Sequence, residues 1–177
     1  GSPDIVVACV AAPVVSEMFT PPAYGTAFTL LAGVTHPTSR GTIRPSGPGR
    51  NDPPLIDPHY LETEYDRQML RKAMTIARLI GRHEALNEWR DQEVYPGDTI
   101  SSDMDLDLFL ARSASTHHHP AGTCAMGRDD AAVVDDRLAV RGIACLFIAD
   151  ASVIPRLPNG PINAAVVAIA ETWSAIA

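Results

Sequence analysis

Residues 117–127, with the sequence HHHPAGTCAMG, hold the densest group of chemically active side chains in the chain. Neighbours in an extended segment point to opposite sides, so three consecutive histidines cannot converge on one metal ion, although His117 and His119 can share a side. Zinc also needs more widely spaced ligands, and we expect no metal here. Two interpretations stay open on local sequence alone. One is a structural loop whose imidazoles bind backbone groups; the other is catalysis, in which a neutral imidazole takes a proton from a substrate hydroxyl.

The composition around this stretch is that of an ordinary globular protein. With 177 residues, 46% of them hydrophobic, the chain is long enough for one compact domain with a core. A net charge of -7 argues against a nucleic-acid partner, because phosphate binding requires a basic surface. Cys9, Cys124 and Cys145 form no CxxC pair and favour a reducing, cytoplasmic setting. No apolar run reaches the roughly 18 residues of a membrane span, so we expect no membrane partner.

The first third of the chain has the pattern of strands joined by long connections. Short apolar runs at residues 5–10 and 27–34, each bounded by Pro, Gly or Ser, predict two strands, and residues 41–44, after a turn-rich segment, predict a third strand of the same antiparallel sheet. Residues 45–58 are dense in Pro, Gly and Asp and are expected to form a loop.

The middle of the chain changes to helical spacing. Apolar residues over 66–82 recur with the period of a helix, which we expect to stop near Gly81. Ser102 or Asp103 is expected to cap a second helix that extends to residue 111.

The last third returns to extended segments and closes with a helix. Residues 133–135 and 146–149 are predicted strand pieces, the second nearly all apolar and therefore expected to be buried on both faces. The final helix is expected to begin near Pro161, because proline is favoured in a first helical turn.

Six segments carry further sequence motifs, and they follow one another in a fixed order. They are HPTSRGTIR (36–44), IDPHYL (56–61), HPAGTCAMG (119–127), VVDDRLAVRGI (133–143), LFIADASVIP (146–155) and NAAVVAIAE (163–171). Taken together and in this order, they resemble the motifs of the glucose-methanol-choline (GMC) family of FAD-dependent oxidoreductases.

The resemblance implies an α+β fold divided between two domains. Residues 1–118 are expected to form part of the GMC substrate-binding domain, an antiparallel sheet with helices. Residues 119–177 are expected to supply the strand and helix that complete the Rossmann-like FAD-binding domain. No GxGxxG fingerprint follows any predicted strand, whereas the family places it near the N-terminus of a chain about three times as long. We therefore expect an N-terminal FAD-binding part as partner, as a cleaved piece or a separate subunit.

The resemblance also implies a chemistry, in which FAD takes a hydride from a carbinol carbon and His119 takes the hydroxyl proton. A second family position, usually His or Asn, corresponds to Pro161, which has no side-chain donor and can offer only its carbonyl. We therefore expect His117 to be the second partner of the substrate oxygen. The open alternative is that His117 supports the site without touching the substrate.

Cofactor contacts are expected at two places in the last third. A helix that starts near Pro161 presents the free N–H groups of Ile162 and Asn163, and its positive end stabilises negative charge on a reduced flavin. Asp150 and Ala151, at the end of a predicted strand, correspond to a family segment that lies against the ribityl and phosphate chain of FAD. Without the resemblance, Asp150 would be interpreted as the cap of a turn or helix.

The expected substrate is a small-molecule primary alcohol. The ending over residues 160–171 and the His-His-His-Pro run resemble a branch of the family that oxidises a hydroxymethyl-aromatic alcohol such as pyridoxine to an aldehyde. Two alternatives stay open: a hydroxynitrile lyase of the same family, and an inactive structural partner subunit.

Overall fold

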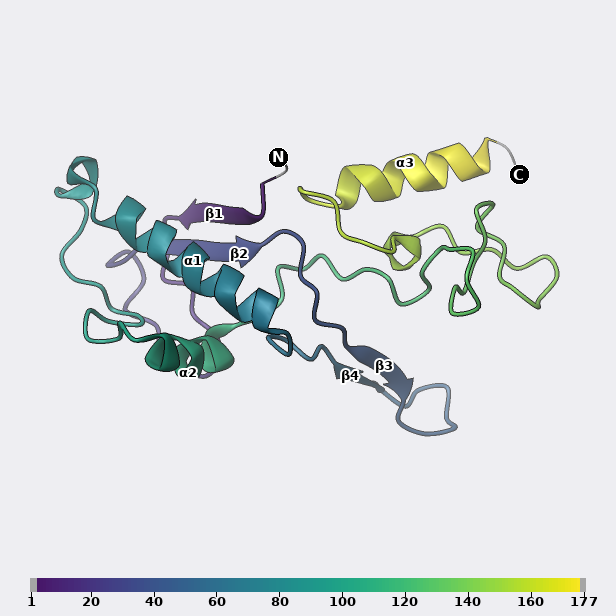
Figure 1. Ribbon diagram of the computed structural model, residues 1–177, viewed down its shortest axis with the longest axis horizontal. Coiled ribbons are helices and arrows are strands. Elements are labelled where there is room, and N and C mark those ends of the chain that lie inside the picture. Colours follow the sequence, from purple (N-terminus) through teal and green to yellow (C-terminus); the bar gives the residue numbers. More distant parts are fainter. Residues whose placement is uncertain (1–2, 176–177) are drawn as a thin grey trace. The chain divides into compact units, whose positions relative to one another are not determined.

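The computed structural model describes residues 3–175, which fall into two compact units. Unit 1 comprises Gly1–Gly41 and Pro58–Ser115, and unit 2 comprises Thr42–Asp57 and Thr116–Ala177. The elements of both are labelled in Figure 1. The proposed domain boundary at 118/119 stays a prediction, because a compact unit of this chain is not in itself a domain of the whole protein. Within residues 3–175, no helix has the length and apolar character needed to cross a membrane.

Unit 1 begins with an antiparallel pair of strands. Strand β1 (Ile5–Val10) pairs with β2 (Thr29–Val34), with Ile5 opposite Val34 and Val10 opposite Thr29. The strand predicted at residues 5–10 is confirmed, and the second begins two residues later than predicted.

Helix α1 (Glu64–Gly81) packs on this pair of strands, as Figure 1 shows. Its buried face consists of Met69, Ala73 and Ala77, which recur every four residues and therefore lie on one side of the helix. The helix ends at the predicted glycine. It begins two residues before the predicted start, because the Thr63 side chain accepts a hydrogen bond from the Asp66 N–H and caps the first turn.

The first turn of α1 contains a buried carboxylate that holds a loop in place. Asp66 is only 3% exposed and accepts hydrogen bonds from the backbone N–H groups of Thr38 (2.8 Å) and Ser39 (2.7 Å) and from the Thr38 hydroxyl (3.0 Å). Burial raises the pKa of Asp66, but these hydrogen bonds outweigh that effect and leave the pKa below its ordinary value. Asp66 thus fastens the turn at residues 36–40 to the helix.

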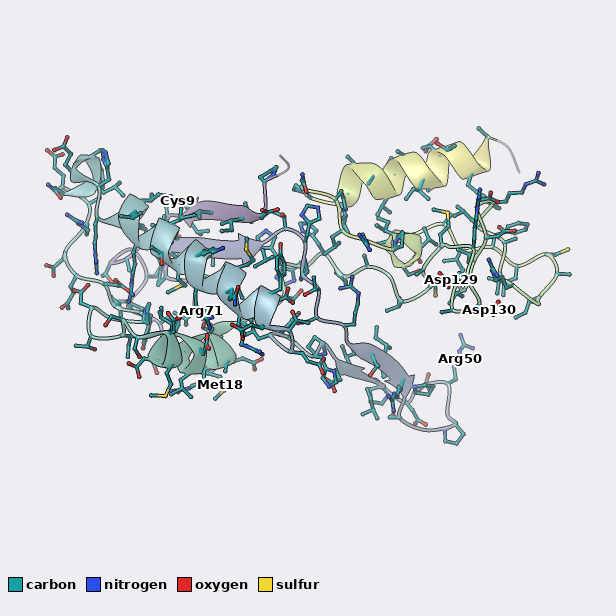
Figure 2. All side chains as sticks on the ribbon, viewed as in Figure 1. Cys9, Met18, Arg50, Arg71, Asp129 and Asp130 are labelled. Atoms are coloured by element: carbon teal, nitrogen blue, oxygen red, sulfur yellow. The ribbon has the colours of Figure 1, made fainter. Side chains whose placement is uncertain are left out.

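Helix α2 (Asp103–Ser113) is capped by Ser102, as predicted, and buries Leu106 and Leu110. An ion pair connects it to α1, because the Arg71 guanidinium donates to both carboxylate oxygens of Asp107 at 2.6 and 2.7 Å. Figure 2 shows Arg71 beside α2. A short 3₁₀ helix, η1 (Glu84–Leu86), follows α1 in the chain.

Unit 2 contains a hairpin where a loop was expected. Strand β3 (Thr42–Pro45) pairs with β4 (Pro54–Asp57), so only the middle of the segment predicted as a loop lacks strand structure. Prolines are tolerated in these strands because each strand has an unpaired edge that needs no N–H donor. The prediction of a single antiparallel sheet is also wrong, since β1–β2 and β3–β4 form two separate two-stranded sheets.

The rest of unit 2 has little regular structure before its last helix. It comprises a 3₁₀ turn, η2 (Ala151–Val153), and helix α3 (Asn163–Ser174). The strand pieces predicted at residues 133–135 and 146–149 are wrong, because this region forms only the isolated bridges Met126–Val134, Val134–Val140 and Ala139–Phe147.

The expected burial of residues 146–149 on both faces is also wrong. Leu146 and Phe147 are each 45% exposed. The physical reason is that no strand among residues 3–175 pairs with this segment along its length, and only an isolated bridge links it to Ala139.

The core of unit 2 is small and lies under α3. It consists of Val134, Leu138 and Val153, of which the two valines are fully buried. Ile169 and Trp173, one turn apart on α3, pack against it. Because Val153 of η2 belongs to this core, the packing of Ile169 and Trp173 holds α3 in place relative to η2.

Candidate active site

The two histidines expected to act together lie together in the structure. The His117 and His119 rings are 5.4 Å apart between centroids and meet edge to face at 61°. His118 between them has a positive φ of 60°, and its N–H donates to the Thr116 hydroxyl at 2.9 Å. His117 and His118 are exposed and His119 is half-buried.

The segment after His119 is fastened to η2 by backbone atoms. The Cys124 N–H donates to the Ser152 carbonyl at 3.0 Å, and the Met126 N–H donates to the Val153 carbonyl at 2.9 Å. Glycine suits position 122 of this segment because its φ is +86°, a conformation that residues with side chains rarely adopt. The HPAGTCAMG and DASVIP motifs are therefore neighbours in space.

Asp150 has the local role that the sequence left open. It is the N-cap of η2, and its carboxylate accepts hydrogen bonds from the N–H (2.8 Å) and the hydroxyl of Ser152. Asp150 is exposed and Ala151 is half-buried. The capping interpretation of Asp150 is confirmed, and its contact with the cofactor stays a prediction.

Helix α3 begins later than its proline predicts. Asn163 is its first residue and Ile162 its N-cap, so Pro161 precedes the helix instead of occupying its first turn. Ile162 is buried at 6% exposure, whereas Pro161 and Asn163 are exposed. No side chain caps this helix, unlike α1 and α2, and its first-turn N–H groups are therefore available to an acceptor.

No hydrogen bond among the described residues links either histidine to Asp150 or Pro161. The structure thus brings His117 and His119 together and fastens their loop to η2. It places Asp150 and Ala151 on η2 and Pro161, Ile162 and Asn163 at the start of α3, all within unit 2. Each of these assignments to catalysis or cofactor binding stays a prediction.

A small apolar hollow of about 250 Å³ lies between η2 and α3. Its walls include Met126, Val153 and Ile154 on one side and Ala165 and Ile169 of α3 on the other.

A larger hollow of about 740 Å³, not predicted from the sequence, lies in unit 1 beside α1 and α2. Glu64, Arg71 and Asp107 line this hollow. The Arg71 guanidinium forms ion pairs with both carboxylates, at 3.0 Å from Glu64 and 2.6 Å from Asp107. Asp107 is the main reason that the pKa of Arg71 lies above its ordinary value. The only advance signal was acidic and basic residues at helical spacing, which is typical of a solvated helix face.

Potential metal ligands and thiols add no further site. Among residues 3–175, no group of three His, Cys, Asp or Glu side chains is placed to hold a metal ion. Cys9 and Cys145 are exposed free thiols, and Cys124 is a half-buried one.

Comparison with known proteins identifies the class of protein that this fold and these motifs define. Residues 37–170 match the family model of GMC oxidoreductase, and the chain belongs to this family. Among its relatives, pyridoxine 4-oxidase of Microbacterium luteolum is 51% identical over 98% of this chain and 34% of the relative. Mouse mitochondrial choline dehydrogenase is 37% identical over 82% of this chain and 25% of the relative.

Solved structures agree with the sequence relatives. The crystal structure of pyridoxine 4-oxidase from Mesorbium loti matches with a TM-score of 0.94 and 51% identity, over 99% of this chain and 34% of that one. A fungal aryl-alcohol oxidase matches with a TM-score of 0.75 and 27% identity, over 83% of this chain and 24% of that one. The family resemblance and the α+β fold expected from the sequence are confirmed.

The chain is much shorter than the relatives it matches. The chain spans about a third of the length of pyridoxine 4-oxidase. The cofactor and enzyme class expected from the sequence are those of its relatives, which include a choline dehydrogenase and an FAD-dependent oxidoreductase.

Proposed function

We propose that this chain, together with an N-terminal FAD-binding part, oxidises a primary alcohol to an aldehyde, with a hydroxymethyl-aromatic such as pyridoxine as substrate. The observation that carries the proposal is the 51% identity to pyridoxine 4-oxidase over 98% of the chain. The paired imidazoles of His117 and His119 support it, because they provide proton acceptors of the kind that alcohol oxidation needs.

In the proposed reaction His119 is the base. One of its ring nitrogens takes the hydroxyl proton, and the bond between oxygen and carbinol carbon becomes a carbonyl as the hydride leaves. FAD, when bound, supplies the acceptor for that hydride. His119 suits this role because it is half-buried on a loop that backbone hydrogen bonds hold against η2.

His117 is the proposed second partner of the substrate oxygen. Pro161 has no N–H and offers only its carbonyl, which can accept a hydrogen bond but cannot donate one. The edge-to-face packing of the two imidazoles allows both to face one small ligand.

The residues present fit part of an FAD site. The first turn of α3, beginning with Ile162 and Asn163, offers N–H groups that no side chain caps, and the positive end of the helix favours an anionic flavin edge. Asp150 and Ala151 on η2 are the proposed contacts of the ribityl and phosphate chain. The glycine-rich turn that holds a dinucleotide pyrophosphate is absent from the sequence, so the N-terminal part must supply it.

The isolated 177-residue chain is therefore expected not to bind FAD stoichiometrically in an absorbance titration. Its described strands form two antiparallel pairs and no βαβ unit that could hold the pyrophosphate. Addition of the N-terminal two thirds of pyridoxine 4-oxidase is expected to produce a bound flavin. Stoichiometric binding by the chain alone would contradict the proposed division of the site.

Replacing His117 with alanine is expected to lower kcat for pyridoxine in the reconstituted enzyme by roughly 10–100-fold, the loss of one hydrogen bond to a charged group. His117→Asn keeps a donor and is expected to lose less. Stopped-flow measurement of anaerobic flavin bleaching separates this step from oxygen consumption. Equal rates in all three proteins would show that His117 only supports the loop.

A further inference from the structure

The β3–β4 hairpin has one wholly apolar face. Directly opposed residues of paired strands lie on the same side of the sheet, so Ile43 with Ile56 and Pro45 with Pro54 form one face. The other face is mixed and consists of Thr42, Arg44, Leu55 and Asp57. The eight-residue connection between the strands carries Arg50 (Figure 2) and is held by the Asp52 carboxylate, which accepts a hydrogen bond from the Gly49 N–H at 2.8 Å.

This apolar face is uncovered in the described part of the chain. Ile43 is 52% exposed and Ile56 is 66% exposed, and every residue of the two strands is exposed. No third strand pairs with the hairpin among residues 3–175. A two-stranded hairpin is only marginally stable in water without further packing, so this face is expected to be covered in the folded protein.

The greater length of the related protein offers an occupant for this face. The hairpin lies within the 99% of this chain that superposes on crystalline pyridoxine 4-oxidase with a TM-score of 0.94, and this chain spans only 34% of that protein. A second copy of the chain is a poor occupant, because a stable dimer buries roughly 20–30 residues on each side. Four apolar residues are far fewer, and they suit one patch of a larger contact within a longer protein.

We propose that the face formed by Ile43, Pro45, Pro54 and Ile56 is a docking surface for the FAD-binding part of a GMC oxidoreductase. The proposal rests on the proposed function, which supplies that part as the partner.

Adjacent residues of β4 provide a matched pair of variants. Ile56 and Leu55 are both apolar, are 66% and 59% exposed, and point to opposite faces. The Ile56→Ser variant is expected to weaken binding to the N-terminal two thirds of Microbacterium luteolum pyridoxine 4-oxidase by about 10–100-fold, because a buried isoleucine is lost from the contact. The Leu55→Ser variant is expected to change binding by less than about threefold, as for a residue outside the contact. Surface plasmon resonance gives the affinity, and flavin co-elution in gel filtration reports the assembled complex.

The outcomes separate this proposal from the one it rests on. If the unaltered chain does not bind the N-terminal part, both proposals fall. If that chain binds and the two variants bind equally well or equally poorly, only the role of the apolar face falls. Sedimentation of the chain alone supplies a further test, since a dimer that Ile56→Ser dissociates would make a second copy the occupant and overturn the proposal. Circular dichroism spectra of both variants are expected to match that of the unaltered chain, because both side chains are exposed.

Discussion

Replacing His119 with alanine is expected to lower kcat for pyridoxine in the reconstituted enzyme by about 10²–10⁴-fold, the range that a positioned general base contributes. Without the imidazole, the hydroxyl keeps its proton while the hydride leaves. No negative charge then develops on the oxygen, and the carbinol carbon is a poorer hydride donor. The measurement is the rate of flavin bleaching under anaerobic conditions, which a lyase would not produce. An intact flavin spectrum before mixing shows that the variant has assembled.

The neighbouring histidine provides the control for this prediction. His118 is exposed and has a φ of 60°, and asparagine is among the residues that tolerate this left-handed conformation. His118→Asn is therefore expected to leave kcat nearly unchanged. If His119→Ala and His118→Asn both turn over alcohol as fast as the unaltered protein, the chain is a structural partner and not the source of the base.

Replacing Asp66 with alanine is expected to lower the free energy of unfolding of the chain by about 3 kcal/mol at neutral pH, because three hydrogen bonds to a buried charged acceptor are lost. The donors are the backbone N–H groups of Thr38 and Ser39 and the Thr38 hydroxyl. Urea denaturation followed by far-ultraviolet circular dichroism measures the loss. The exposed Asp98, paired with Arg82 at 2.7 Å, is the control, and Asp98→Asn is expected to cost less than about 1 kcal/mol.

The same carboxylate makes this stability depend on pH. The pKa of Asp66 lies below its ordinary value in the folded chain, so the unfolded chain binds the proton more readily. The stabilisation is therefore complete above about pH 4, the range of an ordinary aspartate, and is lost as the pH falls through the folded pKa. The difference between the unaltered chain and Asp66→Ala is expected to shrink in acid. A difference that stays constant down to pH 2 would contradict this account.

Local periodicity was enough to predict the elements that are stabilised within the chain itself. The spacing of Met69, Ala73 and Ala77 predicts α1 because these side chains do meet a sheet, and Ser102 predicts the start of α2 because its cap is local. β4 escaped prediction because prolines at residues 53 and 54 are a loop signal, and only the pairing with β3 makes this segment a strand.

Long-range contacts explain what local sequence could not predict. Nothing near Asp66 in the sequence shows that its partners lie 27 and 28 residues earlier in the chain. Leu146 and Phe147 gave the opposite error, since their apolar character predicts burial that residues 3–175 do not provide.

The sequence predicted the residues of the candidate site better than it predicted their backbone conformation. Alternation along an extended segment places His117 and His119 on one side, and the structure brings their rings to 5.4 Å. The positive φ of His118 has no signature in a run of three identical residues. The late start of α3 could not be inferred from Pro161, because proline is also common just before a helix.

The main-chain pairing of residues 124–126 with residues 152–153 carries an evolutionary consequence. Backbone donors and acceptors make this link, so it does not depend on hydrogen bonds from the side chains of Thr123 or Ala125, whereas a substitution of Gly122 would be strained at its φ of +86°. Substitution of the exposed Thr123 is therefore compatible with the same position of the histidine loop, whereas Met126 and Val153 are also constrained by the core that they pack in.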